Sequence, residues 1–349
     1  MLSRMASSLY WIGRYVERAE QTARLTEVTF SHTLAMGSTP EAEARRGRHW
    51  AALLEIVGAG STFPAADWPD ETNVPEHLIF SRENPNSIVE CIAVARDNAR
   101  TMRHQVATEM WEALNRFHLE VEHESHVAHL TAEAETATRF CRSVIDFSQL
   151  LHGITNSTMP REEGWYFLQV GKFLERAEST ARTLDVNYRL LAGDDKGLGD
   201  DRTALPTPDD VQPWASLLHS LSAYESYHRL QRRGIQPYAV IEMLTLSAVL
   251  PRSIRFSIAQ LDAALAHITE QAPGYNGSEP MPGSSTESEA RREVGKLHAD
   301  FAYQRLDELL EGGVHRALVG IQRSCYRIGD CIEEEFFAHR PLTAWQAMA

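Results

Sequence analysis

Acidic and basic side chains recur at helical spacing in residues 9–28, LYWIGRYVERAEQTARLTEV, which contain Glu17, Glu20 and Arg24. A carboxylate can grip an ammonium group or act as a general base. A guanidinium can hold a phosphate or a carboxylate through two parallel hydrogen bonds. We therefore treat Glu17 and Glu20 as candidate catalytic groups. The candidate binding groups beside them are Arg14, Arg18 and Arg24.

The same pattern returns in residues 167–186, FLQVGKFLERAESTARTLDV, with Glu175, Glu178 and Arg182 as the matching residues. Gly171 likewise repeats Gly13, and because a glycine inside a helix costs about 1 kcal/mol, its retention indicates a close backbone approach. If the two copies pack about a pseudo-twofold axis, their glutamates converge. Buried carboxylates must be neutralised by arginines, protons or a metal ion. The repeated face is therefore either a structural network or a ligand site, and the pattern leaves both open.

A second candidate is an anion site at two matching segments, Asn84-Pro-Asn-Ser-Ile88 and Leu250-Pro-Arg-Ser-Ile254. Backbone N–H groups at a helix start can hold an anion together with a serine hydroxyl, although plain N-capping explains the same serines. The residues concerned are Asn86, Ser87, Arg252, Ser253 and Arg255, with Arg96, Arg100 and Arg103 on one downstream helical face.

Two weaker motifs follow. Glu109, Trp111 and Glu112 place two acids beside a tryptophan, which equally suits a helix start with an aromatic anchor. Residues 120–123 form an E-x-x-H, with His126 and His129 behind it. Di-iron bundles need this motif on two helices, and because the second half lacks it we expect a polar exposed face and no metal there. Phosphate-binding loops, dinucleotide fingerprints and nucleophile elbows are absent, so we expect no cofactor bound by this chain.

Helices must position these side chains. Leu9, Ile12, Val16 and Ala19 form one apolar stripe at helical spacing, and Glu17 falls on a second stripe about a quarter-turn away, at the edge of the packed face. Strand patterns are weak. The predicted helices span 3–36, 41–58, 75–82, 85–107, 109–122 and 124–154, then 160–192, 208–231, 236–247, 251–271, 286–312 and 314–340.

Further matches extend the repeat beyond its first helix. Residues 50–54, WAALL, match 214–218, WASLL, and the two Pro-x-Ser-Ile segments follow in the same order. Ordered landmarks of this kind indicate a tandem duplication. Loops at 192–210 and 272–285 are too short to separate independent domains. We therefore predict an all-α protein, one compact helical-bundle body of two pseudo-symmetric halves, residues 1–157 and 158–349.

Composition limits the function. The formal net charge is −14, which argues against nucleic-acid binding because phosphate backbones need a basic face. No stretch approaches the roughly 18 apolar residues of a membrane span, and we expect no signal peptide. The four cysteines are scattered without C-x-x-C spacing, which suits a reducing cytoplasm.

Several ordered segments, among them MLSRMASSLYWIGRYVERAEQTARL, ENPNSIVECIAVARDNARTMR and TEMWEALN, resemble the alpha-E family, an all-helical bacterial family. The resemblance runs over nearly the full length. It implies a neighbour or fusion partner, a circularly permuted ATP-grasp protein, in an amide-forming or peptide-tagging system, with ATP and Mg²⁺ on that partner. The family's motif residues fall here on Arg14, Glu17, Arg18, Glu20, Arg24, Asn86, Ser87, Arg96, Asn98, Arg100, Glu109, Trp111 and Glu112.

The function expected from this resemblance is that of an accessory subunit. It would bind the ligase and present or position an amine or peptide substrate, because an acceptor must lie near the acyl phosphate that such a ligase forms. Two other hypotheses remain open at this stage. One is a stand-alone enzyme with a carboxylate-bound divalent metal between the repeated helices, and the other is a structural adaptor without any site.

Overall fold

A computed structural model describes residues 3–37, 39–64, 66–128, 134–192, 211–231, 234–270 and 288–338. Within those ranges the protein is all-α and contains no β-strand. The first helices are α1 (Ser3–Leu34), α2 (Pro40–Val57), α3 (Asn73–Ile79), α4 (Ile88–Thr101), α5 (Thr108–Ala128) and α6 (Ala134–Thr158). They are followed by α7 (Glu163–Ala192), α8 (Val211–Ser220), α9 (Tyr224–Leu230), α10 (Pro237–Leu246), α11 (Ile254–Glu270), α12 (Glu289–Tyr303), α13 (Leu306–Leu309), α14 (Val314–Ile332) and a π-helical turn, Glu333–Phe337.

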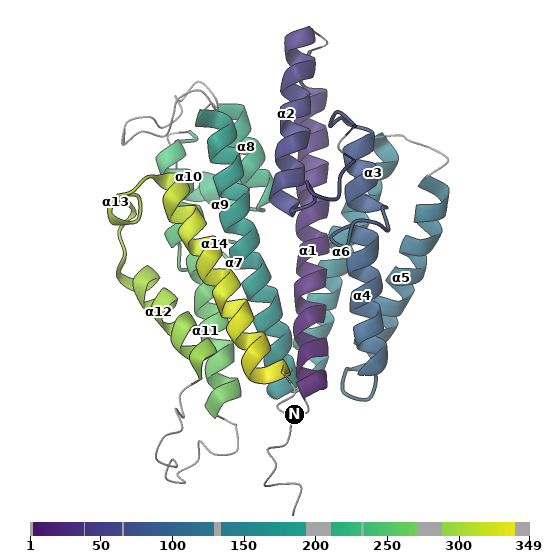
Figure 1. The fold of residues 1–349 in the computed structure, drawn as a ribbon, viewed down its shortest axis with the longest axis vertical. Coiled ribbons are helices and arrows are strands. Elements are labelled where there is room, and N and C mark those ends of the chain that lie inside the picture. The colour runs from purple at the N-terminus through teal and green to yellow at the C-terminus, as the bar shows by residue number, and fades with distance from the viewer. Residues whose placement is uncertain are drawn as a thin grey trace, which may run out of the picture.

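The long helices α1 and α7 lie against each other at the centre (Figure 1). Helices α4 and α6 pack on the outer side of α1, and α11 and α14 pack on the outer side of α7. Helix α2 contacts both central helices. The apolar stripe predicted on α1 is buried, with Leu9 and Ile12 each 1% exposed. Most buried apolar side chains belong to one cluster that includes both central helices.

Local signals set the ends of the helices that approach the centre. Pro40 opens α2 behind Thr39, whose Oγ1 accepts a hydrogen bond from the Ala42 N–H at 3.2 Å, as an N-cap residue does. Gly58 ends α2 with a left-handed φ of 74°, which glycine adopts without steric cost. Ser87 Oγ accepts from the Glu90 N–H at 3.2 Å at the start of α4. Ser253 Oγ accepts from the Phe256 N–H at 3.1 Å at the start of α11.

Four predicted boundaries are wrong. The expected helix at 85–107 already ends at Thr101. The expected helix at 208–231 is split into α8 and α9 at residues 221–223, where Ser222 has a φ of 51°. The expected helix at 286–312 stops at Gln304, which is extended and separates α12 from α13. The expected break at residue 123 is absent, because α5 continues to Ala128. The predicted loops at 192–210 and 272–285 fall almost wholly outside the described residues.

Candidate functional site

The two central helices touch backbone to backbone at a pair of glycines. A Cβ placed on Gly13 would collide with the carbonyl oxygen of Leu168, and one on Gly171 would collide with the carbonyl oxygen of Tyr10. Only a residue without a side chain fits at either point. The close approach expected from the sequence is therefore present, and it brings the glutamates of one helix within reach of the arginines of the other.

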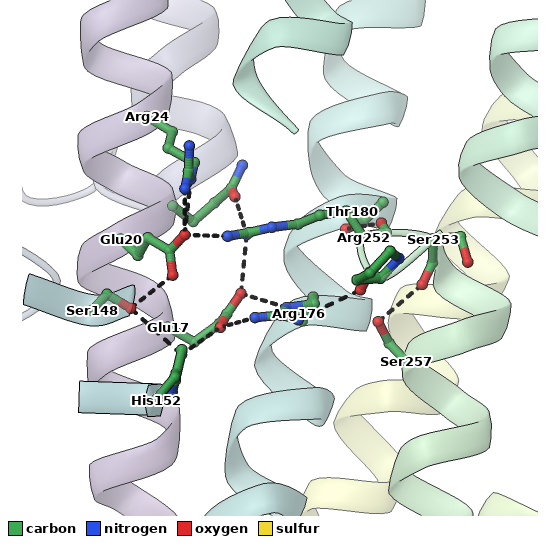
Figure 2. Close-up of polar contacts among 12 residues, drawn as sticks. Glu17, Glu20, Arg24, Ser148, His152, Arg176, Thr180, Arg252, Ser253 and Ser257 are labelled. Carbon is green, nitrogen blue, oxygen red and sulfur yellow. Dashed lines mark hydrogen bonds and ion pairs between the residues drawn. The ribbon is translucent and has the colours of Figure 1, made fainter. Parts of the chain in front are cut away.

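The first group of charges, which we call the sealed cluster, consists of Glu17, Glu20, Arg24, Arg176 and Arg252 (Figure 2). Arg176 donates to both carboxylate oxygens of Glu17, at 2.7 and 2.6 Å, and Arg252 Nη1 donates to Glu17 Oε1 at 3.0 Å. Arg24 Nε donates to Glu20 at 2.8 Å, and Arg252 Nη2 also donates to this carboxylate. Glu17 and Glu20 are 1% and 2% exposed.

The second group, which we call the open cluster, consists of Glu175, Glu178, Arg14, Arg18 and Arg182. Arg18 donates to both oxygens of Glu175, at 2.7 and 3.0 Å. Arg14 donates to Glu175 and, through Nη2, to Glu178 at 2.9 Å. Arg182 donates to Glu178 from the same helix. In each cluster three guanidinium groups face two carboxylates.

A cleft of about 290 Å³ lies beside the open cluster. All five residues of this cluster line it, together with Gln21, Gly58, Asn86, Ser179, Tyr326 and neighbouring apolar side chains. The Arg18 and Arg182 side chains are 20% and 19% exposed, whereas Arg176 and Arg252 of the sealed cluster are 9% exposed. Arg24 of the sealed cluster is 15% exposed and Arg14 of the open cluster 10%. Among the described residues, the cleft is lined by the charges of the open cluster and not by those of the sealed cluster.

Paired arginines keep the carboxylates ionised. Burial alone would raise the pKa of Glu175, but Arg14 and Arg18 lower the pKa to about 2. Burial also opposes ionisation of Glu17, and Arg176 and Arg252 hold its pKa well below the usual range. A carboxylate with such a low pKa is a poor base near neutral pH. The geometry therefore favours a role in holding arginines over proton abstraction by Glu17 or Glu175.

The two segments predicted to hold an anion, residues 84–88 and 250–254, have a different role in the structure. Ser87 and Ser253 serve as N-caps, while the residues just before them reach the charged clusters. Asn86 Oδ1 accepts from Arg18 Nη1 at 2.8 Å, and Arg252 joins Glu17 and Glu20. The two loops thus complete the α1–α7 seam. Arg255 instead donates to the backbone carbonyls of Leu246 and Ala302.

The basic face predicted from Arg96, Arg100 and Arg103 does not join either cluster. The Arg96 and Arg103 guanidinium carbons are each 5.6 Å from the Trp111 ring centroid, Arg100 is exposed beside Asp97, and Glu109 and Glu112 are exposed on α5. Asn98 donates to the Val94 carbonyl within α4. Trp111, Glu112 and His123 border a shallow surface groove. The structure gathers these residues on α4, on the turn that follows it and on α5, apart from both clusters, and His129 lies outside the described residues.

Four residues escaped the sequence reasoning. Ser148 Oγ, on α6, donates to Glu20 Oε2 at 2.7 Å, and His152 Nε2 lies 3.7 Å from Glu17 Oε2. Burial and Arg176 lower the pKa of Lys172 to about 8. Tyr326 OH accepts from Arg182 at 2.6 Å. Lys172 follows Gly171 as Arg14 follows Gly13. The repeat could therefore have identified Lys172 as the counterpart of Arg14. The other three come from helices with no matching motif.

Ligating atoms of Glu17, Glu20 and His152 lie within 4.8 Å of one another, the one such group among the described residues. The donor chemistry suits a divalent cation. Both carboxylates are, however, already bound by arginines. A metal ion would have to displace Arg252 or Arg176.

Fold and site together define an all-helical protein built on a charged seam between two long central helices. Residues 1–337 match the Alpha-E family, described as a predicted alpha-helical domain with a conserved ER motif. The chain belongs to this family. Glu-Arg occurs in it at residues 17–18 and 175–176, where the two dipeptides form the ion pairs that cross the seam.

Relatives from mycobacteria are similar over most of this chain. An uncharacterised Mycobacterium bovis protein is 28% identical in an alignment 338 residues long that covers 90% of this chain and 35% of the relative. A Mycobacterium tuberculosis protein, also uncharacterised, is 27% identical over the same shares. The chain thus spans about a third of the length of these curated relatives. No solved structure matches, and no described helix is long and apolar enough to cross a membrane.

Proposed function

We propose that this chain is the accessory subunit of a circularly permuted ATP-grasp amide or peptide ligase in the bacterial cytoplasm. It binds the ligase and holds an amine, amino-acid or peptide substrate in the cleft beside the open cluster. ATP and Mg²⁺ are bound by the ligase. The substrate is thereby positioned near the acyl phosphate, and such proximity lowers the barrier by several kcal/mol, up to about 7–11 kcal/mol in well-oriented cases.

The observation that carries this proposal is the accessible cleft lined by Arg14, Arg18 and Arg182. The chain has such a charged pocket, yet its sequence has no phosphate-binding loop or dinucleotide fingerprint, so the activating chemistry belongs on another polypeptide or domain. The relatives carry about two thirds of their length outside the match, which leaves room for such a domain. In this scheme Glu17, Glu20, Glu175 and Glu178 hold the arginines in place.

We further propose that residues 1–157 and 158–349 are tandem copies of one helical unit that form a single body. The reciprocal glycine contacts support this, since Gly13 on α1 lies against the backbone of α7 and Gly171 on α7 lies against the backbone of α1. The reciprocal ion pairs of Arg18 with Glu175 and of Arg176 with Glu17 support it as well. Duplication would supply two clusters that each contain three arginines and two glutamates. One of them could then acquire a binding role while the other keeps a structural one.

The test is co-purification of this chain with a circularly permuted ATP-grasp protein from the same organism, followed by ATP turnover with and without the chain. We expect a stable complex and a turnover that depends on the chain. Arg182→Gln should lower turnover while the complex still forms, and the exposed Arg323→Gln on α14 is the matched control. Two proteins that neither associate nor alter each other's turnover would refute the proposal.

A second candidate is a metal-dependent enzyme at the group of Glu17, Glu20 and His152. Metal analysis of protein purified without chelator separates the two hypotheses. A stoichiometric divalent metal that disappears in His152→Ala, a variant that leaves both glutamates in place, would support the enzyme. Protein free of metal that still associates with the ligase would favour the accessory subunit.

A further inference from the structure

We propose that the cleft beside the open cluster binds one small carboxylate ligand of amino-acid size. The ligand carboxylate would be held by Arg18, Arg182 and the side-chain amide of Gln21. This deepens the proposed function and rests on it only for the ligand's role as ligase substrate. The binding itself is a property of this chain and is measured on it alone.

The first argument is a difference between the two loops that meet the seam. Asn86 and Arg252 each stand one residue before an N-capping serine, and each hydrogen-bonds to a cluster. The long Arg252 side chain reaches Glu17, Glu20 and Gln21 and fills the sealed cluster. Asn86 is shorter and reaches only Arg18. The space that a guanidinium fills on one side is therefore left as a cleft on the other.

The second argument is an unsatisfied donor at the wall of this cleft. Gln21 is 4% exposed and lines the cleft. Its Oε1 accepts from Arg252 Nη1 at 3.1 Å, and this contact fixes the orientation of the amide because Nε2 in that place would face another donor. Nε2 itself has no hydrogen-bond partner among the described residues. A buried donor left unpaired costs about 1–3 kcal/mol. Nε2 is covered in the structure, so a ligand oxygen would remove that cost by drawing the Gln21 amide toward the cleft that the residue lines.

The net charge of the open cluster then indicates which kind of hydrogen-bond acceptor the cleft would bind. The open cluster has three guanidinium groups and two carboxylates, so one positive charge is left in excess. Glu175 and Glu178 are each already bound by two arginines, whereas Arg18 and Arg182 keep a partly exposed edge. A ligand carboxylate lies favourably against this excess charge and can receive two N–H bonds from a guanidinium fork. A divalent phosphate would reverse the charge of the cleft.

The volume of the cleft limits how large the remainder of the ligand can be. At about 290 Å³, the cleft lies at the lower edge of the roughly 300–1,000 Å³ typical of pockets for drug-sized ligands. Ser179 and Tyr326 supply hydroxyl groups at its wall, and the glutamates retain unused lone pairs that an ammonium group could meet. A free amino acid, or the carboxyl end of a short peptide, fits both the volume and the mixed charge.

The experiment is isothermal titration of the full 349-residue chain with glycine, L-glutamate, acetate and inorganic phosphate, each added separately near pH 7. We expect binding of one amino acid per chain, stronger than that of acetate and of phosphate. Gln21→Leu removes the amide at similar volume and should weaken binding about tenfold, which is about 1.4 kcal/mol. Arg323→Gln changes an exposed arginine on α14 that does not itself line the cleft, and this control should bind normally.

Filling the cleft gives an independent readout. Asn86→Arg copies the sealed arrangement and should abolish binding, and Ser179→Gln obstructs the same space with a smaller change if the first variant fails to fold. The inference is overturned if no carboxylate binds, if phosphate alone binds, or if both folded filling variants keep full affinity. A chain that binds amino acids but never associates with the ligase refutes the proposed function and leaves the carboxylate site standing.

Discussion

Arg176 donates to both carboxylate oxygens of Glu17 across the contact between the two central helices, at 2.7 and 2.6 Å. The partners lie on different helices and are almost fully buried. Arg18 makes the same kind of pair with Glu175 in the opposite direction. Two forked ion pairs that cross one interface fix the register of α1 against α7, since a shift of either helix would break both pairs at once.

The glycine contact beneath these pairs predicts a steric effect. Gly13→Ala and Gly171→Ala should each destabilise the fold by about 1–3 kcal/mol or more, because the added methyl group meets a backbone carbonyl that cannot rotate away. Gly153→Ala is the matched control: it is exposed in α6 with nothing within 4 Å of the added Cβ, and should stabilise by up to about 1 kcal/mol. Urea unfolding measures all three, and equal effects at Gly13 and Gly153 would contradict the close approach.

The sealed cluster predicts a large cost for losing its shared cation. Arg252→Met should destabilise the protein by about 3–5 kcal/mol, since Glu17 and Glu20 would stay buried with fewer partners. The double variant Glu20→Gln with Arg252→Met should lose less than the sum of the two single losses, because the unpaired charge is gone. Additive losses in a double-mutant cycle would show that the two side chains do not interact.

Much of this arrangement was predictable from local patterns. The apolar stripe through Leu9 and Ile12 and the repeated glycine together predicted which faces pack and where the backbones approach. The partners of Glu17 were only partly predictable. Arg252 comes from a loop and His152 from α6, and no spacing in α1 encodes a contact with a residue that distant in sequence. The split at Ser222 was missed because it depends on a left-handed backbone at a residue type that seldom adopts it.

Glu175 should contribute to the unfolding of the protein by acid, beside Glu17 and Glu20, whose pKa values are also lowered. The folded pKa of Glu175 is about 2, below the ordinary value of 4.5, so its stabilisation is present above pH 4.5 and is lost as pH falls toward 2. The shift corresponds to about 3 kcal/mol. The free energy of unfolding, measured from pH 5 to pH 2, should fall less steeply in Glu175→Gln than in the unmodified chain. Glu225→Gln, which changes an exposed acid on α9 outside both clusters, is the control, and equal slopes in all three proteins would refute the assignment.

Lys172 predicts a dependence of the same sign at alkaline pH. Its folded pKa of about 8 lies below the ordinary lysine value of 10.5, because the side chain is buried and lies near Arg176. Between these pH values the unfolded chain binds more protons than the folded one, so this group makes stability rise with pH. Buried cysteines act in the other direction, because burial raises the pKa of Cys91 to about 12. The contribution of Lys172 must therefore be isolated as a difference between two proteins.

Lys172→Met provides that difference. The variant removes the excess positive charge at similar length, so it should be more stable than the unmodified chain near pH 7 and should lose this advantage as pH approaches 10.5. Urea unfolding at pH 7, 8.5 and 10 measures the change, and Lys296→Met, which removes an exposed surface lysine paired with Glu293, controls for the loss of a charge alone. If Lys172→Met were less stable at pH 7, the ammonium group would be a needed partner of Glu17 and Glu20, and the sealed cluster would rely on it as the open cluster relies on Arg14.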